Sequence, residues 1–215
     1  MNLLIVAATE FEIAPLLPHF TTTDGGYTYL NHTIQVLVTG VGMVATTHHL
    51  TKMLAHNSFD VVLNMGIAGS FNAQYTIGSV VNVTQDCLAE LGAENDNAFI
   101  PMDTLGFVPR NQLIINALFN IENHALDQLP KVNGITVNTV HGNAQSIAKV
   151  QQLYAPDVET MEGAAVLYVC AMQQQLVVQL RAISNKVEVR NTANWNVALA
   201  ITSLTTEVLN IMREL

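Results

Sequence analysis

The sequence has very few positive charges. Its 215 residues contain four Lys and four Arg against 17 Asp and Glu, which gives a formal net charge of -9. A protein that binds nucleic acid needs a basic surface that neutralises phosphates, and this composition offers none. The sequence therefore argues against nucleic acid as a partner.

Cysteines and long apolar runs are also scarce. Cys87 and Cys170 are too few for a disulfide framework, and Cys170 lies in an apolar helical pattern that is typical of a buried thiol. No uninterrupted apolar stretch approaches the roughly 20 residues of a membrane span. Residues 3–7 are typical of a first strand, not of a signal peptide. We therefore expect a soluble, cytoplasmic protein without a membrane partner.

Half of the residues are apolar and only 12% are charged, which is typical of a globular protein. No repeat, low-complexity segment or linker divides the chain, so residues 1–215 are predicted to form a single domain. With so few charged residues, one subunit would have more apolar surface than it can bury by itself. We therefore expect a homo-oligomer, either a dimer or an assembly of dimers.

The apolar patterns predict an α/β fold with a largely buried central sheet. Residues 27–30 and 34–38 flank a polar connection of hairpin length, which predicts an antiparallel excursion and hence a mixed sheet. Residues 90–109 have the Gly, Asn, Asp and Pro content of a long surface loop. The predicted strands are 3–7, 34–38, 61–65, 80–83, 135–140 and 177–183. The predicted helices are 44–55, 146–154, 161–174 and 195–215.

Carboxylates lie at two predicted helix starts. Glu10 and Glu12 follow the strand at residues 3–7, and Glu162 opens the helix at residues 161–174. Acidic residues are common in a first helical turn because the helix dipole favours negative charge there, so each has a purely structural interpretation. Glu10 and Glu12 point in different directions, and at most one of them would face a pocket. Met161 alone is typical of a core residue.

Two glycine runs, 40–42 and 66–70, either bring backbone amides close to a ligand or close tight turns. Neither has the lysine of a P-loop or the full spacing of a dinucleotide fingerprint. The histidines of residues 44–56 lack the i, i+4 spacing of a metal pair, so no metal site is predicted. His141, at the end of the predicted strand 135–140, either lines a site or lies on an exposed loop.

Four segments occur in an informative order. They are Ala8-Thr9-Glu10-Phe11-Glu12, Asn64-Met65-Gly66-Ile67-Ala68-Gly69, Val158-Glu159-Thr160-Met161-Glu162-Gly163-Ala164-Ala165 and Arg181-Ala182-Ile183-Ser184-Asn185. Together they resemble the nucleoside phosphorylase and nucleosidase superfamily. Within it the sequence is most similar to the futalosine hydrolases, which are relatives of the methylthioadenosine/S-adenosylhomocysteine nucleosidases. The match extends over nearly the whole chain.

The resemblance implies a three-layer α/β/α fold with a central mixed sheet and a site at strand ends that a neighbouring subunit helps to form. It implies hydrolysis of the N-glycosidic bond of futalosine, with release of hypoxanthine and dehypoxanthinyl futalosine in menaquinone biosynthesis, and it implies no cofactor. The resemblance also implies site residues. Glu12 would activate the attacking water, and Asn185 would bind the purine. Met161 and Glu162 would bind the ribose hydroxyls, with Ala68 and Gly69 near the sugar.

The amide of Asn185 is a departure from adenine-specific relatives, which have an aspartic acid at this position. An amide donates to O6 of hypoxanthine and accepts from N7 as that nitrogen gains a proton, so the departure favours a 6-oxopurine. Ile67 and Gln145 also depart from those relatives, and we assign them no role. Arg190 is a candidate for binding the aryl carboxylate of futalosine, with an exposed side chain as the alternative.

The segments 8–12 and 66–70 lack the arginines of phosphorolytic relatives, which favours water over phosphate as the nucleophile. Three alternatives remain open. They are a methylthioadenosine/S-adenosylhomocysteine nucleosidase, a purine nucleoside phosphorylase and a nucleoside-binding protein without catalysis.

Overall fold

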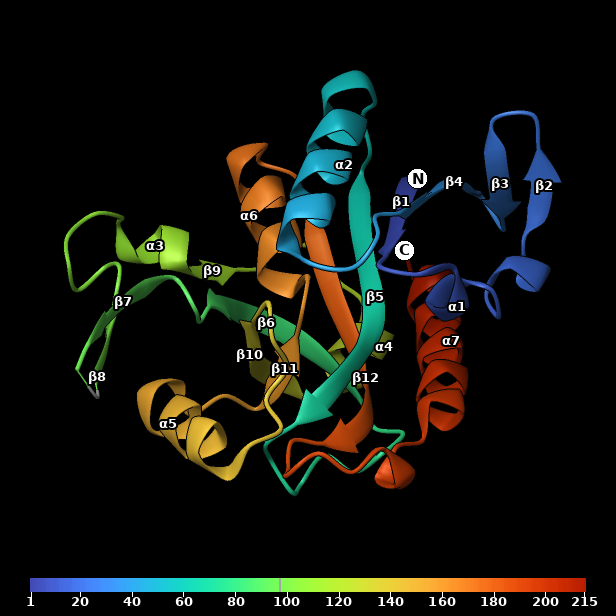
Figure 1. Cartoon of the computed structure of the whole chain (residues 1–215). Helices are drawn as coiled ribbons and strands as arrows, with labels where there is room; N and C mark the ends of the chain where they lie inside the picture. Colours follow the sequence, from blue (N-terminus) through green and yellow to red (C-terminus); the bar gives the residue numbers. More distant parts are fainter. Residues whose placement is uncertain (97) are drawn as a thin grey trace.

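A mixed β-sheet forms the centre of the protein, with helices on both of its faces (Figure 1). The computed structural model describes residues 1–96 and 98–215. The strand order is β11-β10-β6-β12-β5-β1-β4-β3-β2, and β9 also pairs with β6. The strands are β1 (Asn2–Ala7), β2 (Thr21–Thr23), β3 (Gly26–Tyr29), β4 (His32–Val38), β5 (Val61–Ser70), β6 (Val80–Leu88), β9 (Ile114–Asn116), β10 (Lys131–Thr136), β11 (Val158–Thr160) and β12 (Val177–Lys186).

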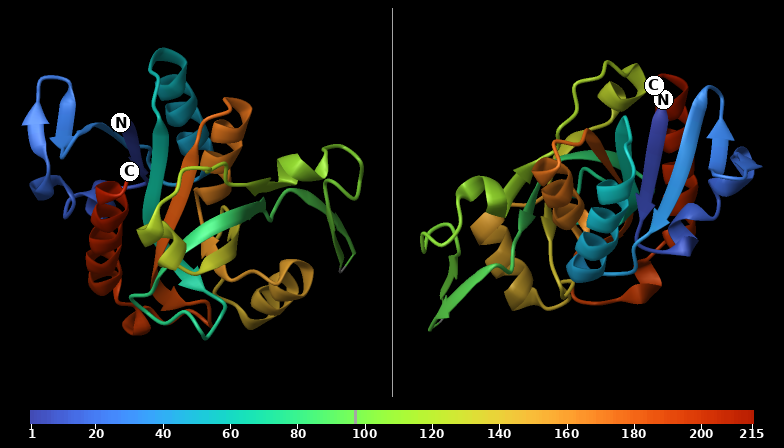
Figure 2. Two further views of the ribbon diagram at one scale, coloured as in Figure 1. Left: turned by 180° about the vertical axis from the view of Figure 1, so that it is seen from behind. Right: turned by 90° about the horizontal axis from the view of Figure 1, so that it is seen from above.

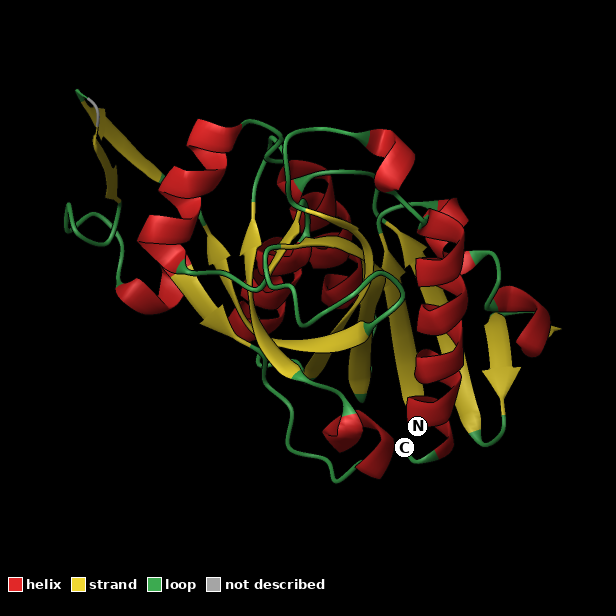
Figure 3. Cartoon of the chain, turned by 90° about the horizontal axis from the view of Figure 1, so that it is seen from below, coloured by secondary structure: helices red, strands yellow, loops and turns green. Residues whose placement is uncertain are grey.

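One part of the sheet curls back on itself. Strand β11 pairs in parallel with β10 and in antiparallel with the end of β5, so the pairings among β5, β12, β6, β10 and β11 form a closed circuit. Figure 3, seen from below, shows these curved strands and the loops that cross their ends. The curl brings segments that are far apart in the sequence to the end of β5.

Strand β1 shows why the sheet is buried on both faces. Leu3 and Ile5 pack in one apolar cluster, whereas Leu4 and Val6 pack in another, because successive side chains of a strand point to opposite faces. The first cluster includes residues of α7, and the second includes residues of α2 and α6. Figure 2 shows these helices on opposite sides of the sheet.

The four helices that the apolar spacing predicts are present, with ends that differ by a few residues, as is usual for helix boundaries. Two short helices, at residues 110–113 and 124–128, were not predicted. The described helices are α1 (Glu10–Ile13), α2 (Met43–His56), α3 (Arg110–Leu113), α4 (His124–Gln128), α5 (Ala144–Tyr154), α6 (Gly163–Met172) and α7 (Val197–Arg213), with short 3-10 turns at Leu17–His19 and Thr192–Asn194. The predicted α/β class and mixed sheet are confirmed, as is the antiparallel pairing of β3 with β4.

Several predicted boundaries were wrong at the positions that matter for a site. The glycine run 66–70 is not a turn, because it lies within β5 and pairs with β12. Ser184 and Asn185 lie inside β12 and not beyond its end, since the same pairing prolongs that strand. Strand β10 ends at Thr136, so residues 137–140 are not strand, and α6 begins at Gly163, after Met161 and Glu162.

The segment 90–109 also differs from the predicted loop. It contains a small antiparallel hairpin of β7 (Gly92–Asn95) and β8 (Ala98–Pro101). Asn97, which belongs to the predicted loop, lies outside the described residues. Among the described residues no helix is long and apolar enough to cross a membrane.

Candidate active site

Glu12 is a buried carboxylate near the end of β1, on the one-turn helix α1. Its Oε2 accepts hydrogen bonds from the backbone N–H of Thr9 at 3.0 Å and from the Thr9 hydroxyl at 3.1 Å. Its Oε1 accepts the backbone N–H of Ile67 in β5 at 3.1 Å. These three donors hold the carboxylate in one orientation between β1 and β5. Glu10, by contrast, is exposed.

Gly66 makes room for that carboxylate. A Cβ atom at this position would lie 2.8 Å from Oε1 of Glu12 and 3.6 Å from Nη1 of Arg181. A real Cβ does not approach an oxygen that closely, so any larger residue would displace the carboxylate. The glycine in β5 therefore makes room for the Glu12 side chain, which is neither of the two interpretations that the sequence left open.

Glu162 lies at the start of α6 and faces the same cavity as Glu12. Its Oε1 accepts the backbone N–H of Gly42 at 2.8 Å, which ties α6 to the loop before α2. Gly42 has φ 93°, a left-handed value that favours glycine. Burial raises the pKa of Glu162, although the Gly42 N–H and the charge of Arg181 act in the opposite direction.

Arg181 supplies a buried positive charge to the cavity that Glu12 and Glu162 line. It is 2% exposed, and it donates to the carbonyls of Leu180 at 2.9 Å and Asn64 at 3.4 Å. Burial lowers its pKa, and the charges of Glu162 and Glu12 oppose that shift. The sequence places Arg181 in a motif but assigns it no role. Its signal was a charged residue inside an apolar strand, because a buried charge needs partners.

Asn185 and Gly69 line a second pocket further along β5 and β12. The Ser184 hydroxyl donates to Oδ1 of Asn185 at 2.8 Å, and Nδ2 of Asn185 donates to the Lys186 carbonyl at 2.9 Å. A Cβ at Gly69 would lie 3.1 Å from Nδ2 of Asn185 and 2.8 Å from Cγ2 of Val187. The orientation of the amide is therefore fixed, and one Nδ2 hydrogen remains for a ligand.

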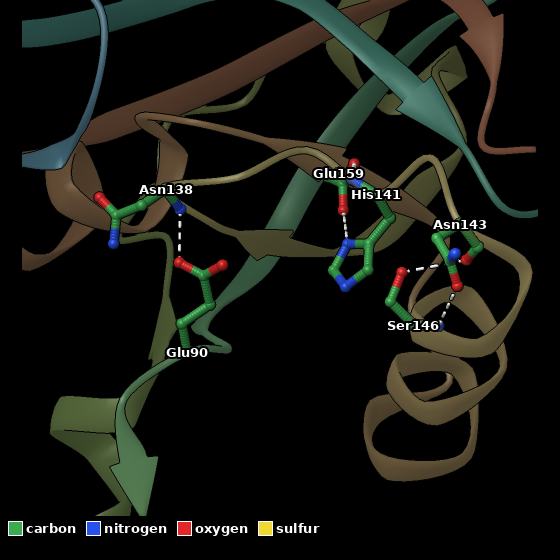
Figure 4. Close-up of polar contacts among 6 residues, drawn as sticks. All are labelled: Glu90, Asn138, His141, Asn143, Ser146 and Glu159. Carbon is green, nitrogen blue, oxygen red and sulfur yellow. Dashed lines mark hydrogen bonds and ion pairs between the residues drawn. The ribbon is translucent and has the colours of Figure 1, made fainter. Parts of the chain in front are cut away.

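Glu159 and His141 lie in the same pocket as Asn185. Oε1 of Glu159 accepts the backbone N–H of His141 at 2.9 Å, and Oε2 pairs with Nδ1 of the imidazole (Figure 4). Of the two interpretations of His141, the structure supports the residue that lines a pocket. Arg190 also lines it, with the guanidinium carbon 5.2 Å from the ring centroid of Trp195.

Two predicted residues lie beside these pockets without lining them. Ala68 is buried, and its side chain packs with Val81 and Val83. Met161 is partly buried and directly precedes Glu162. Neither side chain is among those that line the cavity of Glu12 or the pocket of Asn185. A role for Ala68 would therefore fall to its backbone.

A network of buried hydrogen bonds fixes the first residues of α6 against β6 and β10. Asp86, which is fully buried in β6, accepts hydrogen bonds from Gln179 at 2.7 Å and from the Thr136 hydroxyl at 2.9 Å. The Thr136 hydroxyl in turn accepts the backbone N–H of Ala164 at 2.7 Å. A Cβ at Gly163 would lie 2.3 Å from Oδ2 of Asp86. Burial raises the pKa of Asp86 to about 6.

The sequence of the chain matches a known protein family over nearly its whole length. Residues 2–213 match the profile of the Phosphorylase superfamily. The chain belongs to this superfamily. The four sequence segments that suggested the resemblance meet at the two pockets of the structure, because β1, β5, β11 and β12 bring them there.

Relatives within the superfamily include nucleosidases. The chain is 32% identical over 151 residues to futalosine hydrolase of Streptomyces coelicolor, a match that covers 70% of this chain and 64% of that protein. It is 29% identical over 202 residues to aminodeoxyfutalosine nucleosidase of Campylobacter jejuni, with 86% of each protein covered. The chain thus spans a little under two thirds of the Streptomyces protein.

Solved structures of superfamily members share the fold. A 5'-methylthioadenosine/S-adenosylhomocysteine nucleosidase of Colwellia psychrerythraea, in complex with adenine, superimposes with a TM-score of 0.84 at 19% identity. The match covers 100% of this chain and 96% of that one. The predicted nucleoside phosphorylase-like architecture is therefore confirmed.

Proposed function

We propose that the protein hydrolyses the N-glycosidic bond of futalosine and releases hypoxanthine and dehypoxanthinyl futalosine in menaquinone biosynthesis. The observation that carries the proposal is the fixed amide of Asn185 at one end of a site whose other end holds two carboxylates, the buried Glu12 and the partly buried Glu162. The futalosine hydrolase of Streptomyces coelicolor is a relative of this chain and supports the choice of substrate.

The two pockets have the spacing that a nucleoside needs. Gly66 and Ile67 line the cavity of Glu12, whereas Gly69 lines the pocket of Asn185. Two residues of a strand span about 7 Å, so one ligand reaches both regions along β5. In this arrangement the sugar lies between Glu12 and Glu162, and the purine lies over Gly69 against Asn185.

Glu12 is the proposed base. It takes one proton from a water molecule, whose oxygen bonds to C1′ of the sugar while the electron pair of the C1′–N9 bond leaves with the purine. The purine anion takes up a proton from solvent and departs as neutral hypoxanthine, and Glu12 later returns its proton to solvent. The donors from Thr9 and Ile67 leave Glu12 little freedom, so the carboxylate stays at the wall of the cavity that it lines.

Glu162 is the proposed ribose ligand, because a carboxylate accepts hydrogen bonds from a vicinal diol. Its attachment to Gly42 fixes its place at the start of α6. Met161 and the backbone of Ala68 and Gly69 complete the proposed sugar contacts. The positive charge of Arg181 reduces the electrostatic repulsion between Glu12 and Glu162, so both carboxylates can line one cavity.

Asn185 is the proposed purine ligand. Its remaining Nδ2 hydrogen donates to O6 of hypoxanthine, and Oδ1 accepts from N7 once that nitrogen is protonated. A leaving purine gains negative charge in the transition state, so both contacts strengthen as the bond breaks.

Water is the better nucleophile than phosphate in this cavity. Among the described residues, Arg181 is the one cation that lines it, and Glu12 and Glu162 outweigh its charge. A phosphate dianion would meet a net negative site, which electrostatics disfavours. We accordingly propose hydrolysis and not phosphorolysis, with no cofactor.

An adenine nucleosidase is the second candidate. The relative from Campylobacter jejuni, named aminodeoxyfutalosine nucleosidase, favours it. We prefer the 6-oxopurine because a carboxylic acid at position 185 would suit adenine better than an amide does.

We further propose a cytoplasmic single-domain protein that forms a homo-oligomer. Strongly exposed apolar side chains, such as Val44 (84%) and Phe107 (77%), support the homo-oligomer.

The test is release of free base in phosphate-free buffer from futalosine, inosine and methylthioadenosine in parallel. We expect hypoxanthine from futalosine without added phosphate. Adenine release from methylthioadenosine at a comparable rate would overturn the base assignment. Turnover that requires phosphate would identify a phosphorylase, and tight binding without turnover would identify a nucleoside-binding protein.

A further inference from the structure

Helix α6 begins at the proposed ribose ligand, but Glu162 does not cap its own helix. Glu162 is the N-cap residue, and within the described chain its side chain makes no capping hydrogen bond to α6. N-cap residues usually satisfy N–H groups of the first turn with their own side chains. The carboxylate of Glu162 instead accepts the backbone N–H of Gly42 at 2.8 Å. The first N–H groups of α6 therefore need acceptors from other elements of the fold.

Two threonine hydroxyls are these acceptors. Oγ1 of Thr160 accepts the backbone N–H of Gly163 at 3.1 Å, and Oγ1 of Thr136 accepts that of Ala164 at 2.7 Å. Thr136 and Thr160 are pairing partners in the parallel strands β10 and β11, so their side chains point to the same face of the sheet. All four residues are buried, so bulk water does not replace either hydroxyl.

The carboxylate of Asp86 sets the direction of these hydrogen bonds. The Thr136 hydroxyl lies 2.9 Å from Oδ1 of Asp86 and 3.1 Å from the hydroxyl of Thr160. A hydroxyl has one hydrogen to donate, and an ionised carboxylate only accepts. Thr136 therefore gives its hydrogen to Asp86, and Thr160 gives its hydrogen to Thr136. The lone pairs of both hydroxyls then accept from the N–H groups of α6.

The same contacts hold the backbone of Glu162 in place. The N–H of Gly163 belongs to the planar peptide group that joins Gly163 to Glu162, so its hydrogen bond to Thr160 fixes the orientation of that group. Gly163 makes this approach possible. A Cβ there would lie 2.3 Å from Oδ2 of Asp86 and 2.9 Å from Oγ1 of Thr160. The strands thus fix the backbone of Glu162, while Gly42 fixes its carboxylate.

We propose that Thr160 and Thr136, oriented by Asp86, are positioning residues that cap α6 in place of Glu162 and keep its carboxylate available to the ribose hydroxyls. Without these acceptors, the first N–H groups of α6 would compete with the ribose for that carboxylate. Neither threonine is among the residues that line the cavity of Glu162 or the pocket of Asn185. The inference rests on the proposed function and names residues that serve its sugar site without contacting the substrate.

The test compares kcat/KM for futalosine with kcat/KM for an analogue that lacks the 2′ and 3′ hydroxyls. Thr160→Val keeps the shape of the side chain but removes the acceptor of the Gly163 N–H. The value for futalosine should therefore fall about tenfold or more, because a buried donor is left unsatisfied. The analogue offers Glu162 no diol, so its value should change less than about threefold. A general loss of structure would lower both values equally.

Conservative variants separate the lost acceptor from a change in packing. Thr160→Ser retains the oxygen and should stay within about threefold of the wild type for both substrates. Asp86→Asn retains an oxygen for the Thr136 hydroxyl and should do the same. Thr136→Val tests the same pattern should Thr160→Val fail to fold. Thr205→Val, at a buried threonine of α7 whose hydroxyl donates to the Ile201 carbonyl, is the matched control and should change neither value.

Calorimetric binding of inosine and 2′,3′-dideoxyinosine, with Glu12→Gln present to stop turnover, makes the test independent of catalysis. Thr160→Val should weaken inosine binding about tenfold and binding of the dideoxy nucleoside less than about threefold. Equal losses for both nucleosides, or a loss that Thr160→Ser shares, would overturn the inference and leave the proposed function standing. No base release from futalosine by the wild type, together with a ribose-dependent loss of inosine binding, would overturn the proposed reaction and leave the positioning role standing.

Discussion

The backbone N–H of Ile67 donates to Oε1 of Glu12 at 3.1 Å, which fixes the carboxylate after β1 against the middle of β5. The neighbouring residue, Gly66, has no side chain at the point where a Cβ would lie 2.8 Å from the same oxygen. One strand thus provides both the donor that orients Glu12 and the space that Glu12 occupies. The geometry of the proposed base depends on β5 as much as on its own helix.

Glu12→Gln should abolish most hydrolysis and leave binding nearly unchanged. The amide retains an oxygen for the Ile67 N–H but takes no proton from water, so kcat for hypoxanthine release should fall about 10²–10⁴-fold. Steady-state kinetics with futalosine measures the loss, and calorimetry with free hypoxanthine checks that the purine pocket is intact. Wild-type kcat in this variant would rule out Glu12 as the base.

Gly66→Ala should reduce catalysis by displacing Glu12 and not by unfolding the protein. The added methyl forces Oε1 to move, and we expect kcat to fall at least about tenfold, with a loss of about 1–3 kcal/mol in the free energy of unfolding. Gly25→Ala is the matched control, because no atom lies within 4 Å of a Cβ there. Equal kcat values for the two variants would show that the close approach is dispensable.

Asn185→Asp should shift the base preference from hypoxanthine toward adenine. A carboxylate repels O6, whereas the protonated acid donates to N7 and the ionised form accepts from the exocyclic amine of adenine. The ratio of kcat/KM for the adenine analogue to that for futalosine should rise about tenfold or more. Asn57→Asp, at an exposed position after α2, controls for the added charge. An unchanged ratio would remove Asn185 from the base site.

Asp86 should make the free energy of unfolding fall as the pH rises. Its pKa is raised by burial from 3.8 to about 6, so between these values the native state binds more protons than the unfolded state. Stability from this group is therefore greatest below about pH 4 and is lost as the pH rises through about 6. The loss is about 3 kcal/mol, taking each pKa unit as about 1.4 kcal/mol.

Urea unfolding of the wild type and of Asp86→Asn, at about pH 4 and about pH 8, isolates this effect. The asparagine does not titrate. The difference in free energy of unfolding between the variant and the wild type should therefore change by about 3 kcal/mol from about pH 4 to about pH 8, in favour of the variant at high pH. Parallel pH dependences would mean that Asp86 has the same pKa in both states.

Much of the fold follows from local pattern. The continuous apolar run in β1 and the spacing in α2, α5 and α7 predicted these elements to within a few residues, because each must bury one face or both. The ends of β5 and β12 were missed. Gly66 and Asn185 are poor strand residues locally, and only the pairing of the two strands with each other extends them.

The proposed site shows the same division. Glu12, Glu162 and Asn185 were found from the motifs in which they occur, and their roles stay predictions. Arg181 was passed over because its charge is balanced by the carboxylates of Glu12 and Glu162, and Glu12 is distant from it in the sequence. The pairing of His141 with Glu159 was missed as well, since no spacing rule relates the start of β11 to the segment after β10.

By itself, the sequence determined the longer helices and most of the central strands, the α/β class, the mixed sheet and the residue types available for chemistry, because helix and strand periods are local properties of a chain. Only the tertiary structure decided which side chains share a cavity. The curl of β11 onto β5 sets Glu159 and Asn185 on either side of Gly69, and the absence of a Cβ at Gly66 admits Glu12. Such contacts depend on the register of paired strands and on the space that a glycine leaves open. The pattern of residues along the chain specifies neither of them.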